Sequence, residues 1–110
     1  LLHLKYMDPC PNVVIEAMAS GLPVIGSDSG GMAELVQANG GVLLPVGNSW
    51  EELFYPSVGD LCDAIMKVGE SIVECRLKAR RHAAAHFSSE DWLDSHARLF
   101  STLPVLTPTA

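Results

Sequence analysis

Short apolar runs separated by glycine- and proline-containing turns predict three β-strands with helices between them. Residues 1–5 (LLHLK), 23–26 (PVIG) and 41–44 (GVLL) have the apolar, partly β-branched character of strands buried in a sheet. Residues 13–20 are expected to form a helix between the first two strands, and a second helix is expected to begin at Met32. The order β-α-β-α-β predicts parallel strands joined by right-handed crossovers, which is an α/β fold.

Three parallel strands cannot cover their own edges, so we expect them to belong to a larger, doubly wound Rossmann-like sheet. The chain has no initiator Met and opens inside an apolar run, and we therefore interpret it as a piece of a longer protein. Residues 1–102 are expected to be the C-terminal part of that domain. Residues 103–110, which include Pro104 and Pro108, are expected to form a flexible tail.

Local signals mark where the helices begin and end. Asn12 is a good N-cap candidate for the first helix, and Gly21 stands where a left-handed residue would end it. The second half of the chain reads as helical, because serine-x-x-acid capping boxes recur there. The four boxes are Ser49 with Glu52, Ser57 with Asp60, Ser71 with Glu74, and Ser88 with Asp91. The last helix is expected to be amphipathic, with apolar residues at helical spacing between Trp92 and Phe100.

Charge and cysteine content exclude several classes of function. The net charge of −6 argues against nucleic acid and against an anionic membrane as partners. Residues 1–66 contain eight acids and a single base, Lys5. Three cysteines in an apolar chain suggest reduced thiols and a cytoplasmic protein, and no apolar run is long enough to span a membrane.

The histidines do not indicate a metal site. His82 and His86 have the four-residue spacing of two zinc ligands, but no third ligand accompanies them. The HAAAH segment lies among arginines, so we expect both histidines at a solvated surface and no metal. His3, on the first strand, is expected to be a packing residue or a residue at the edge of the sheet.

Two acids follow the predicted sheet in a pattern that suggests a binding site. In doubly wound sheets ligands bind beyond the carboxyl ends of the strands. The loop that carries Asp8 follows the first strand, and residues 27–31 follow the second, so both should lie at one edge. Glu16 lies inside the helix that the Asp8 loop leads into. No G-x-G-x-x-G follows any strand, which makes a nicotinamide-binding domain a weak alternative.

Residues 8–36, DPCPNVVIEAMASGLPVIGSDSGGMAELV, resemble the sugar-donor segment of retaining glycosyltransferases of the GT-B fold, in particular the GT4 group. Members of that group carry two acids with seven residues between them, then an EAMA-x-G-x-PV-I run, then a Gly-Gly-x-x-Glu helix start. Asp8 and Glu16 have this spacing here, and the last element is Gly30 to Glu34. The close match covers roughly residues 2–46.

The resemblance implies a role for each matching residue. Glu16 would bind the ribose hydroxyls of a nucleotide diphosphate sugar, and Asp8 would contact hydroxyls of the donor sugar as the catalytic-site acid. Backbone amides near Asn12, Val13 and Val14 would approach the sugar and the diphosphate. Gly30 and Gly31 serve either the backbone geometry of the turn or direct contact with the ligand. The group more often has Glu at the first acid position, so the shorter Asp8 leaves the identity of the sugar open.

The resemblance also implies what this chain lacks. The Arg/Lys pair that stabilises the leaving nucleotide, and the domain that binds the sugar, lipid or other small acceptor, would both lie upstream of Leu1. Any contact with a membrane surface would be made by that part, and no cofactor is expected. The full-length protein would transfer a hexosyl group, and this fragment alone would be inactive. The alternative is a non-catalytic module that has kept the fold and binds a nucleotide sugar or a partner.

Elementary chemistry agrees with these assignments. A carboxylate can accept from two neighbouring hydroxyls at once, which suits the ribose role of Glu16. A helix N-terminus offers unpaired N–H groups and a partial positive charge to a diphosphate. This would help to explain phosphate binding in a region where Lys5 is the single cation.

Overall fold

Three parallel strands form the centre of the fold, in the order β1-β2-β3, in a computed structural model that describes residues 1–104. The strands are β1 (Leu2–His3), β2 (Val24–Asp28) and β3 (Gly41–Pro45). Ile25 of β2 lies opposite Leu2 of β1 and Val42 of β3. The predicted parallel α/β sheet is thus confirmed. β1 is shorter than expected and β2 is longer at its carboxyl end.

Helices cover both faces of the sheet, as a doubly wound arrangement requires. Helices α1 (Asn12–Ala19) and α2 (Met32–Gly40) pack on the face that includes Val24. Helix α3 (Val58–Glu70) packs on the opposite face, where Ala64 and Val68 contact Ile25. Because Val24 and Ile25 are neighbours in one strand, their side chains point to opposite faces and join the two halves of the core.

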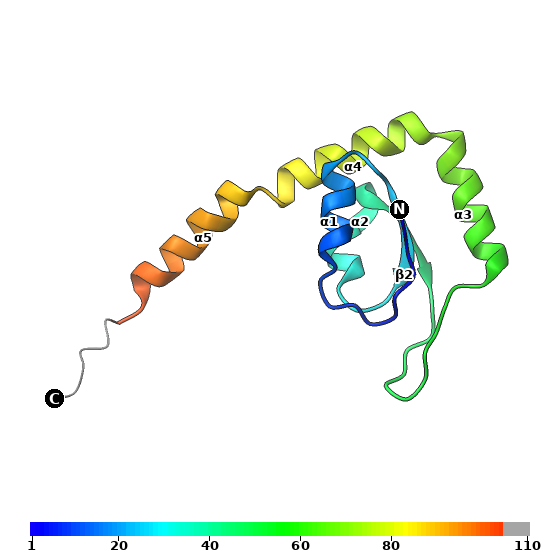
Figure 1. Cartoon of the computed structure of the whole chain (residues 1–110), viewed down its shortest axis with the longest axis horizontal. Coiled ribbons are helices and arrows are strands. Elements are labelled where there is room, and N and C mark those ends of the chain that lie inside the picture. Colours follow the sequence, from blue (N-terminus) through cyan, green and yellow to red (C-terminus); the bar gives the residue numbers. More distant parts are fainter. Residues whose placement is uncertain (105–110) are drawn as a thin grey trace.

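Helix α4 (Ile72–His86) packs against both α1 and α2 and runs along the top of the molecule in Figure 1. Ala79 and Ala83 are buried against these helices. Two arginines of α4 also bond the carboxyl end of α1: Arg80 donates to the carbonyl of Ala19 at 2.7 Å and Arg76 to that of Gly21 at 3.3 Å. These carbonyls have no partner inside α1, so α4 completes the end of that helix.

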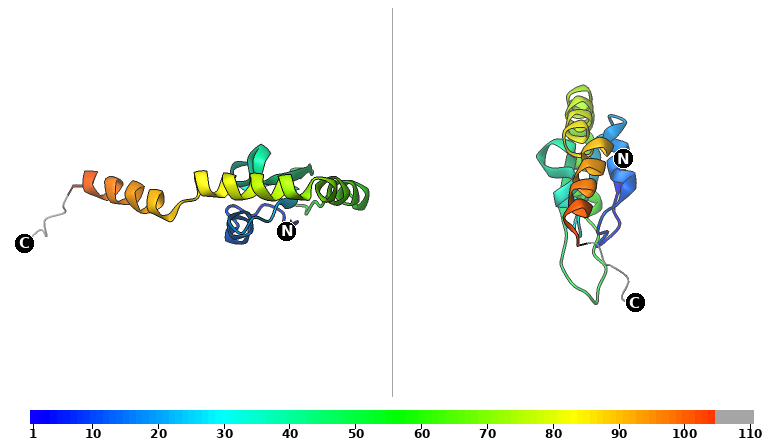
Figure 2. Two further views of the ribbon diagram at one scale, coloured as in Figure 1. Left: turned by 90° about the horizontal axis from the view of Figure 1, so that it is seen from above. Right: turned by 90° about the vertical axis from the view of Figure 1, so that its left-hand side faces the viewer.

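Helix α5 (Ser89–Thr102) extends away from the rest of the chain (Figures 1 and 2). None of its residues is buried, and the molecule is 65 Å long but 17 Å thick. The amphipathic last helix is therefore confirmed as a helix, with its apolar side chains exposed to solvent. Among these, Trp92 and Phe100 are 58% and 65% exposed. The expected tail from Leu103 falls largely on residues 105–110, outside the described part of the chain.

The capping predictions divide into correct and incorrect ones. Ser57 and Ser88 are the N-caps of α3 and α5, and each accepts from the N–H three residues on. Gly21 has the predicted left-handed φ of 74° just beyond α1. Asn12 is wrong as an N-cap, because the extended Pro11 occupies that place and Asn12 is the first helical residue, without a side-chain cap.

The other two boxes are also wrong. Residues 46–57 form no helix, and the Ser49 hydroxyl accepts from the N–H of Glu51 instead of that of Glu52. Ser71 stands between α3 and α4 and does not cap α4. Its hydroxyl donates to the carbonyl of Lys67 in the preceding helix at 3.3 Å, so it serves the end of α3.

We expect Ser57→Ala to lower the free energy of unfolding by about 1 kcal/mol, because it removes a side-chain acceptor from the first turn of α3. Ser71→Ala should cost well under half as much, because Ser71 does not accept from the start of α4. Chemical denaturation of the two variants side by side measures both effects. Equal losses would mean that the Ser57 hydroxyl does not act as a cap.

His82 is a further correction, since it was expected at the surface together with His86. His86 is exposed, but His82 is 97% buried, at 3% exposure, between α2 and α4. Its Nε2 lies 2.8 Å from the carbonyl oxygen of Leu35. Helix α2 departs from helical geometry at Gln37, so the Leu35 carbonyl needs a partner from outside the helix. His82 supplies that partner, which accounts for its burial.

Candidate functional site

The loop that follows β1 and the turn that follows β2 are in direct contact at the carboxyl edge of the sheet. The N–H of Gly31 donates to the carbonyl of Asp8 at 2.9 Å, and the N–H of Met7 donates to the Ser29 hydroxyl at 3.0 Å. Gly30 has a left-handed φ of 60°. A β-carbon on Gly30 would overlap the backbone of Asp8, so this approach depends on glycine.

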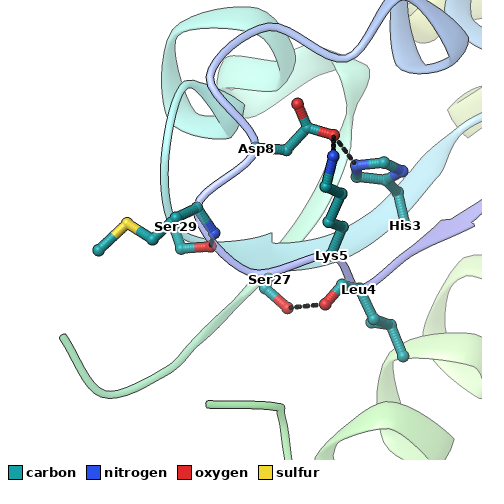
Figure 3. Close-up of polar contacts among 7 residues, drawn as sticks. His3, Leu4, Lys5, Asp8, Ser27 and Ser29 are labelled. Atoms are coloured by element: carbon teal, nitrogen blue, oxygen red, sulfur yellow. Dashed lines mark hydrogen bonds and ion pairs between the residues drawn. The ribbon is translucent and has the colours of Figure 1, made fainter. Parts of the chain in front are cut away.

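Two bases hold the Asp8 carboxylate at this edge (Figure 3). His3 Nε2 lies 3.2 Å from Oδ2 of Asp8, and Lys5 Nζ lies 3.6 Å from the same oxygen. Because a carboxylate only accepts, Nε2 is the ring nitrogen that carries the proton. The second oxygen, Oδ1, has no partner within residues 1–104. Asp8 thus keeps one oxygen available for a hydroxyl, and its side chain is 14% exposed.

A backbone feature brings Asp8 back over the end of β1. Met7 has a φ of 55°, which is uncommon for a residue with a side chain. This conformation turns the chain, and Asp8 then reaches His3 five residues earlier. The expectation that His3 is an edge or packing residue missed this contact. The sequence does place His3 close to the Asp8 loop and two residues before Lys5, and this nearness was the available signal.

The first turn of α1 lies next along the chain and presents backbone N–H groups. The N–H groups of Asn12 and Val13 have no acceptor among the described residues, and both side chains are exposed. Val14 differs, because its side chain is fully buried and its N–H donates to the carbonyl of Pro11 at 3.1 Å. Of the three backbone amides that the resemblance implies, those of Asn12 and Val13 are available to a ligand, whereas that of Val14 is already hydrogen-bonded.

Glu16 is exposed on α1, one turn beyond this start. Its side chain has no hydrogen-bond or ion-pair partner within residues 1–104. The neighbouring Ala17 and Met18 face the core, so the helix is fixed while the carboxylate remains in solvent. Glu16 can therefore accept hydroxyl groups without first losing an internal contact.

The loop after β3 borders the same edge through Tyr6. The Tyr6 hydroxyl donates to the carbonyl of Ser49 at 2.9 Å and accepts from the Ser49 N–H at 2.8 Å. The ring of Phe54 meets that of Tyr6 edge-on, with 5.8 Å between centroids. All three loops after the strands are thus tied together. Tyr6 was not singled out from the sequence, although its place directly after a strand end could have suggested it.

The arrangement suits a ligand that carries both hydroxyl groups and phosphate. Asp8 and Glu16 can accept from hydroxyls, while Asn12, Val13 and Lys5 can donate to anionic oxygens. No group of three or more His, Cys, Asp or Glu side chains that could hold a metal ion is found in the described 104 residues. Within the same part of the chain, no helix is both long enough and apolar enough to cross a bilayer.

Comparison with known proteins identifies the family. Searches of curated proteins and of solved structures yielded no match. A family model described as glycosyl transferases group 1 matches residues 2–64, which is more than half of the 110 residues. The matched region contains the whole sheet, α1, α2 and the loops that carry Asp8, Gly30 and Gly31. Residues 1–104 thus form an α/β unit built around the matched segment, and the chain belongs to the glycosyl transferases group 1 family.

Proposed function

We propose that this chain is the sugar-donor-binding part of a retaining, GT4-type glycosyltransferase with a GT-B fold. In this proposal, the intact protein moves a hexosyl group from a nucleotide diphosphate sugar to a sugar, lipid or other small acceptor. Glu16 binds the ribose hydroxyls, and Asp8 contacts the donor sugar. The N–H groups of Asn12 and Val13 face the diphosphate, and the acceptor domain belongs to the part of the protein upstream of Leu1.

One observation carries the proposal: the Asp8 loop lies directly on the Gly30–Gly31 turn, through the 2.9 Å hydrogen bond from Gly31 to Asp8. This contact sets the acid that follows β1 and the start of α1 at one edge of a parallel sheet, where α/β proteins bind nucleotides. The Asp8 oxygen and the two N–H groups that lack partners supply acceptors for hydroxyls and donors for phosphate.

The geometry also refines the roles that the family motif suggests for Gly30, Gly31 and Val14. Gly31 donates its N–H to Asp8, so its role in the proposal is to shape the turn and not to contact the ligand. The N–H of Gly30 has no acceptor among residues 1–104, and it is a further group that can meet the ligand. Val14 contributes through packing, because its side chain and N–H are both occupied.

Thermal unfolding of the intact protein with UDP, GDP or ADP tests the proposal. A ligand that binds only the folded state stabilises it by RT ln(1 + [L]/Kd), which is about 2.7 kcal/mol at a hundredfold excess over Kd. We expect one of the three nucleotides to raise the unfolding temperature by several degrees, and the corresponding nucleotide sugar to do the same. If none of them shifts the transition at millimolar concentration, the proposal is wrong.

Transfer assays with the stabilising nucleotide sugar then separate the enzyme from the non-catalytic module. Hydrolysis of the donor or its transfer to an acceptor, with retention at the anomeric carbon, supports the glycosyltransferase. If the intact protein binds the nucleotide sugar but neither hydrolyses it nor transfers the sugar to any acceptor tested, it is a non-catalytic binding module.

A further inference from the structure

The pair formed by His3 and Asp8 is the least exposed base–acid pair within residues 1–104. The two side chains are 13% and 14% exposed, and Nε2 of His3 lies 3.2 Å from Oδ2 of Asp8. Lys5 approaches the same oxygen at 3.6 Å, but its side chain is 69% exposed. Solvent weakens a contact between two sheltered groups less than one that involves an exposed lysine. His3 is therefore the partner that fixes the Asp8 carboxylate.

His3 stands on the sheet, whereas Asp8 belongs to a loop. In the register of the strands, His3 of β1 lies opposite Gly26 of β2. A β-carbon on Gly26 would come within 2.7 Å of the His3 carbonyl oxygen, so the two strands approach each other closely at this point. Groups on strands hold a geometry more precisely than groups on loops. The contact with His3 thus ties the loop side chain to the rigid part of the fold.

The loop turns back towards His3 through a backbone conformation that costs free energy. Met7 has a φ of 55°, in the left-handed region that residues with a side chain seldom adopt. Two hydrogen bonds hold this turn, from the Met7 N–H to the Ser29 hydroxyl at 3.0 Å and from the Gly31 N–H to the Asp8 carbonyl at 2.9 Å. Strained backbone of this kind persists where surrounding contacts hold it, and it is common at functional sites. These bonds fix the main chain of Asp8, and His3 fixes its side chain.

The contact with His3 determines which oxygen of Asp8 remains available. An aspartate held only by its main chain can rotate about two side-chain bonds, and the second of these has a broad preference. The bond from His3 occupies Oδ2 and removes this freedom. Oδ1 points away from both bases (Figure 3) and has no partner within residues 1–104. The carboxylate therefore presents one free oxygen in a fixed direction.

We propose that His3 is a positioning residue for sugar transfer, which holds Asp8 so that Oδ1 meets a hydroxyl group of the donor sugar. This inference rests on the proposed function, and His3 is not among the residues to which the family resemblance assigns a role. His3 donates from Nε2 to Oδ2 of Asp8 and does not touch the ligand. A displacement of about 1 Å in a reacting geometry can slow a reaction by about a hundredfold. The contribution of His3 should therefore appear in turnover and not in the binding of the nucleotide.

Replacement of His3 by alanine in the intact protein tests this role. We expect His3→Ala to lower kcat for the nucleotide sugar by about tenfold, because a hydrogen bond to a charged group is lost. The dissociation constant of the nucleotide without its sugar should stay within about twofold of the original value, because the start of α1 is unchanged. His86→Ala is the matched control, since His86 is an exposed histidine at the end of α4. This control should leave both quantities as they are.

Glutamine at this position separates a positioning role from a merely structural one. Its side-chain N–H donor is the same number of bonds from Cα as Nε2 of histidine, so it can reach Oδ2 of Asp8. His3→Gln should restore kcat to within about threefold of the original value. A glutamine variant as slow as His3→Ala would overturn the proposal. So would an alanine variant that loses nucleotide affinity and turnover equally, because the whole loop would then have moved.

Thermal unfolding shows whether the variants of His3 are folded. If His3→Ala is not, His3→Asn takes its place, because the asparagine amide is one bond shorter and does not reach Oδ2. NMR of the intact protein with isotope-labelled histidine adds a readout that needs no turnover. The neutral His3 ring should carry its proton on Nε2, and Asp8→Asn should shift that resonance. A proton on Nδ1 instead would contradict the proposal.

The nucleotide screen distinguishes failure of this inference from failure of the proposed function. If a nucleotide binds and the donor is turned over, but His3→Ala keeps the original kcat, His3 does not position Asp8 and the proposed function stands. If no nucleotide binds, the proposed function is wrong and the positioning role falls with it.

Discussion

Replacement of Glu16 by alanine is expected to weaken binding of the nucleotide sugar to the intact protein by roughly 30- to 150-fold. A carboxylate that accepts from both ribose hydroxyls makes two charge-assisted hydrogen bonds, and their loss costs about 2–3 kcal/mol. Glu16 is exposed and its side chain has no hydrogen-bond or ion-pair partner among residues 1–104, so the substitution should leave the fold unchanged. Calorimetric titration with the nucleotide found in the thermal screen measures the effect.

The matched control for this variant is Glu70→Ala, which removes another exposed helix carboxylate, at the far end of α3. The affinity of this variant for the nucleotide sugar should equal that of the original protein.

Asp8→Asn should behave differently from Glu16→Ala. It should lower turnover more than it lowers the affinity for the nucleotide sugar, because we assign Asp8 to the donor sugar and not to the ribose. Unchanged affinity in Glu16→Ala would refute the assignment of Glu16 to the ribose. An Asp8→Asn variant that loses affinity but keeps turnover would refute the assignment of Asp8 to the donor sugar.

The second large effect is expected from Gly31→Ala, which should lower the free energy of unfolding by about 3 kcal/mol. The new β-carbon would overlap the carbonyl group of Pro9, which is backbone and cannot rotate away. Overpacking of this kind costs about 1–3 kcal/mol, and displacement of the loop would also break the 2.9 Å bond from Gly31 to Asp8, worth about 1 kcal/mol. The backbone of Gly31 has an ordinary φ of −88°, so the cost is steric.

Gly69→Ala is the control for this substitution. Gly69 lies inside α3, and a β-carbon there meets nothing within 4 Å. Alanine should therefore stabilise the protein by about 0.5–1 kcal/mol through its higher helix propensity. Chemical denaturation gives both values. A Gly31→Ala variant as stable as the original protein would show that the Asp8 loop does not depend on this close approach.

The order and pairing of the strands could be predicted from the sequence because each signal was local. Pro and Gly bound the runs PVIG and GVLL, and helical segments stand between the strands. The contact between the Asp8 loop and the Gly30–Gly31 turn followed from topology, since both come after strands of one parallel sheet. The true caps at Ser57 and Ser88 were likewise readable from a few neighbouring residues.

The features that were missed depend on contacts between distant parts of the chain or on unusual backbone angles. His82 is buried because the interruption of α2 at Gln37 leaves a carbonyl for it, and nothing in HAAAH shows that interruption. The pairing of His3 with Asp8 needs the left-handed Met7, a residue type that seldom adopts this conformation. Pro11 takes the cap position in an extended conformation and makes no side-chain cap, and Asn12 becomes the first helical residue, which its own strong N-cap preference did not indicate.

The bonds from Arg76 and Arg80 to the end of α1 have a consequence for where this unit can be divided. The family match ends at Ala64, yet α4 covers the helix that carries Glu16 and supplies Ala79 and Ala83 to its core. A fragment cut at the limit of the match would expose Val14 and Met18 to water and lose both arginine contacts. Any piece of this architecture that keeps α1 covered must therefore extend through the buried Ala83 of α4, well past the segment by which the family is recognised.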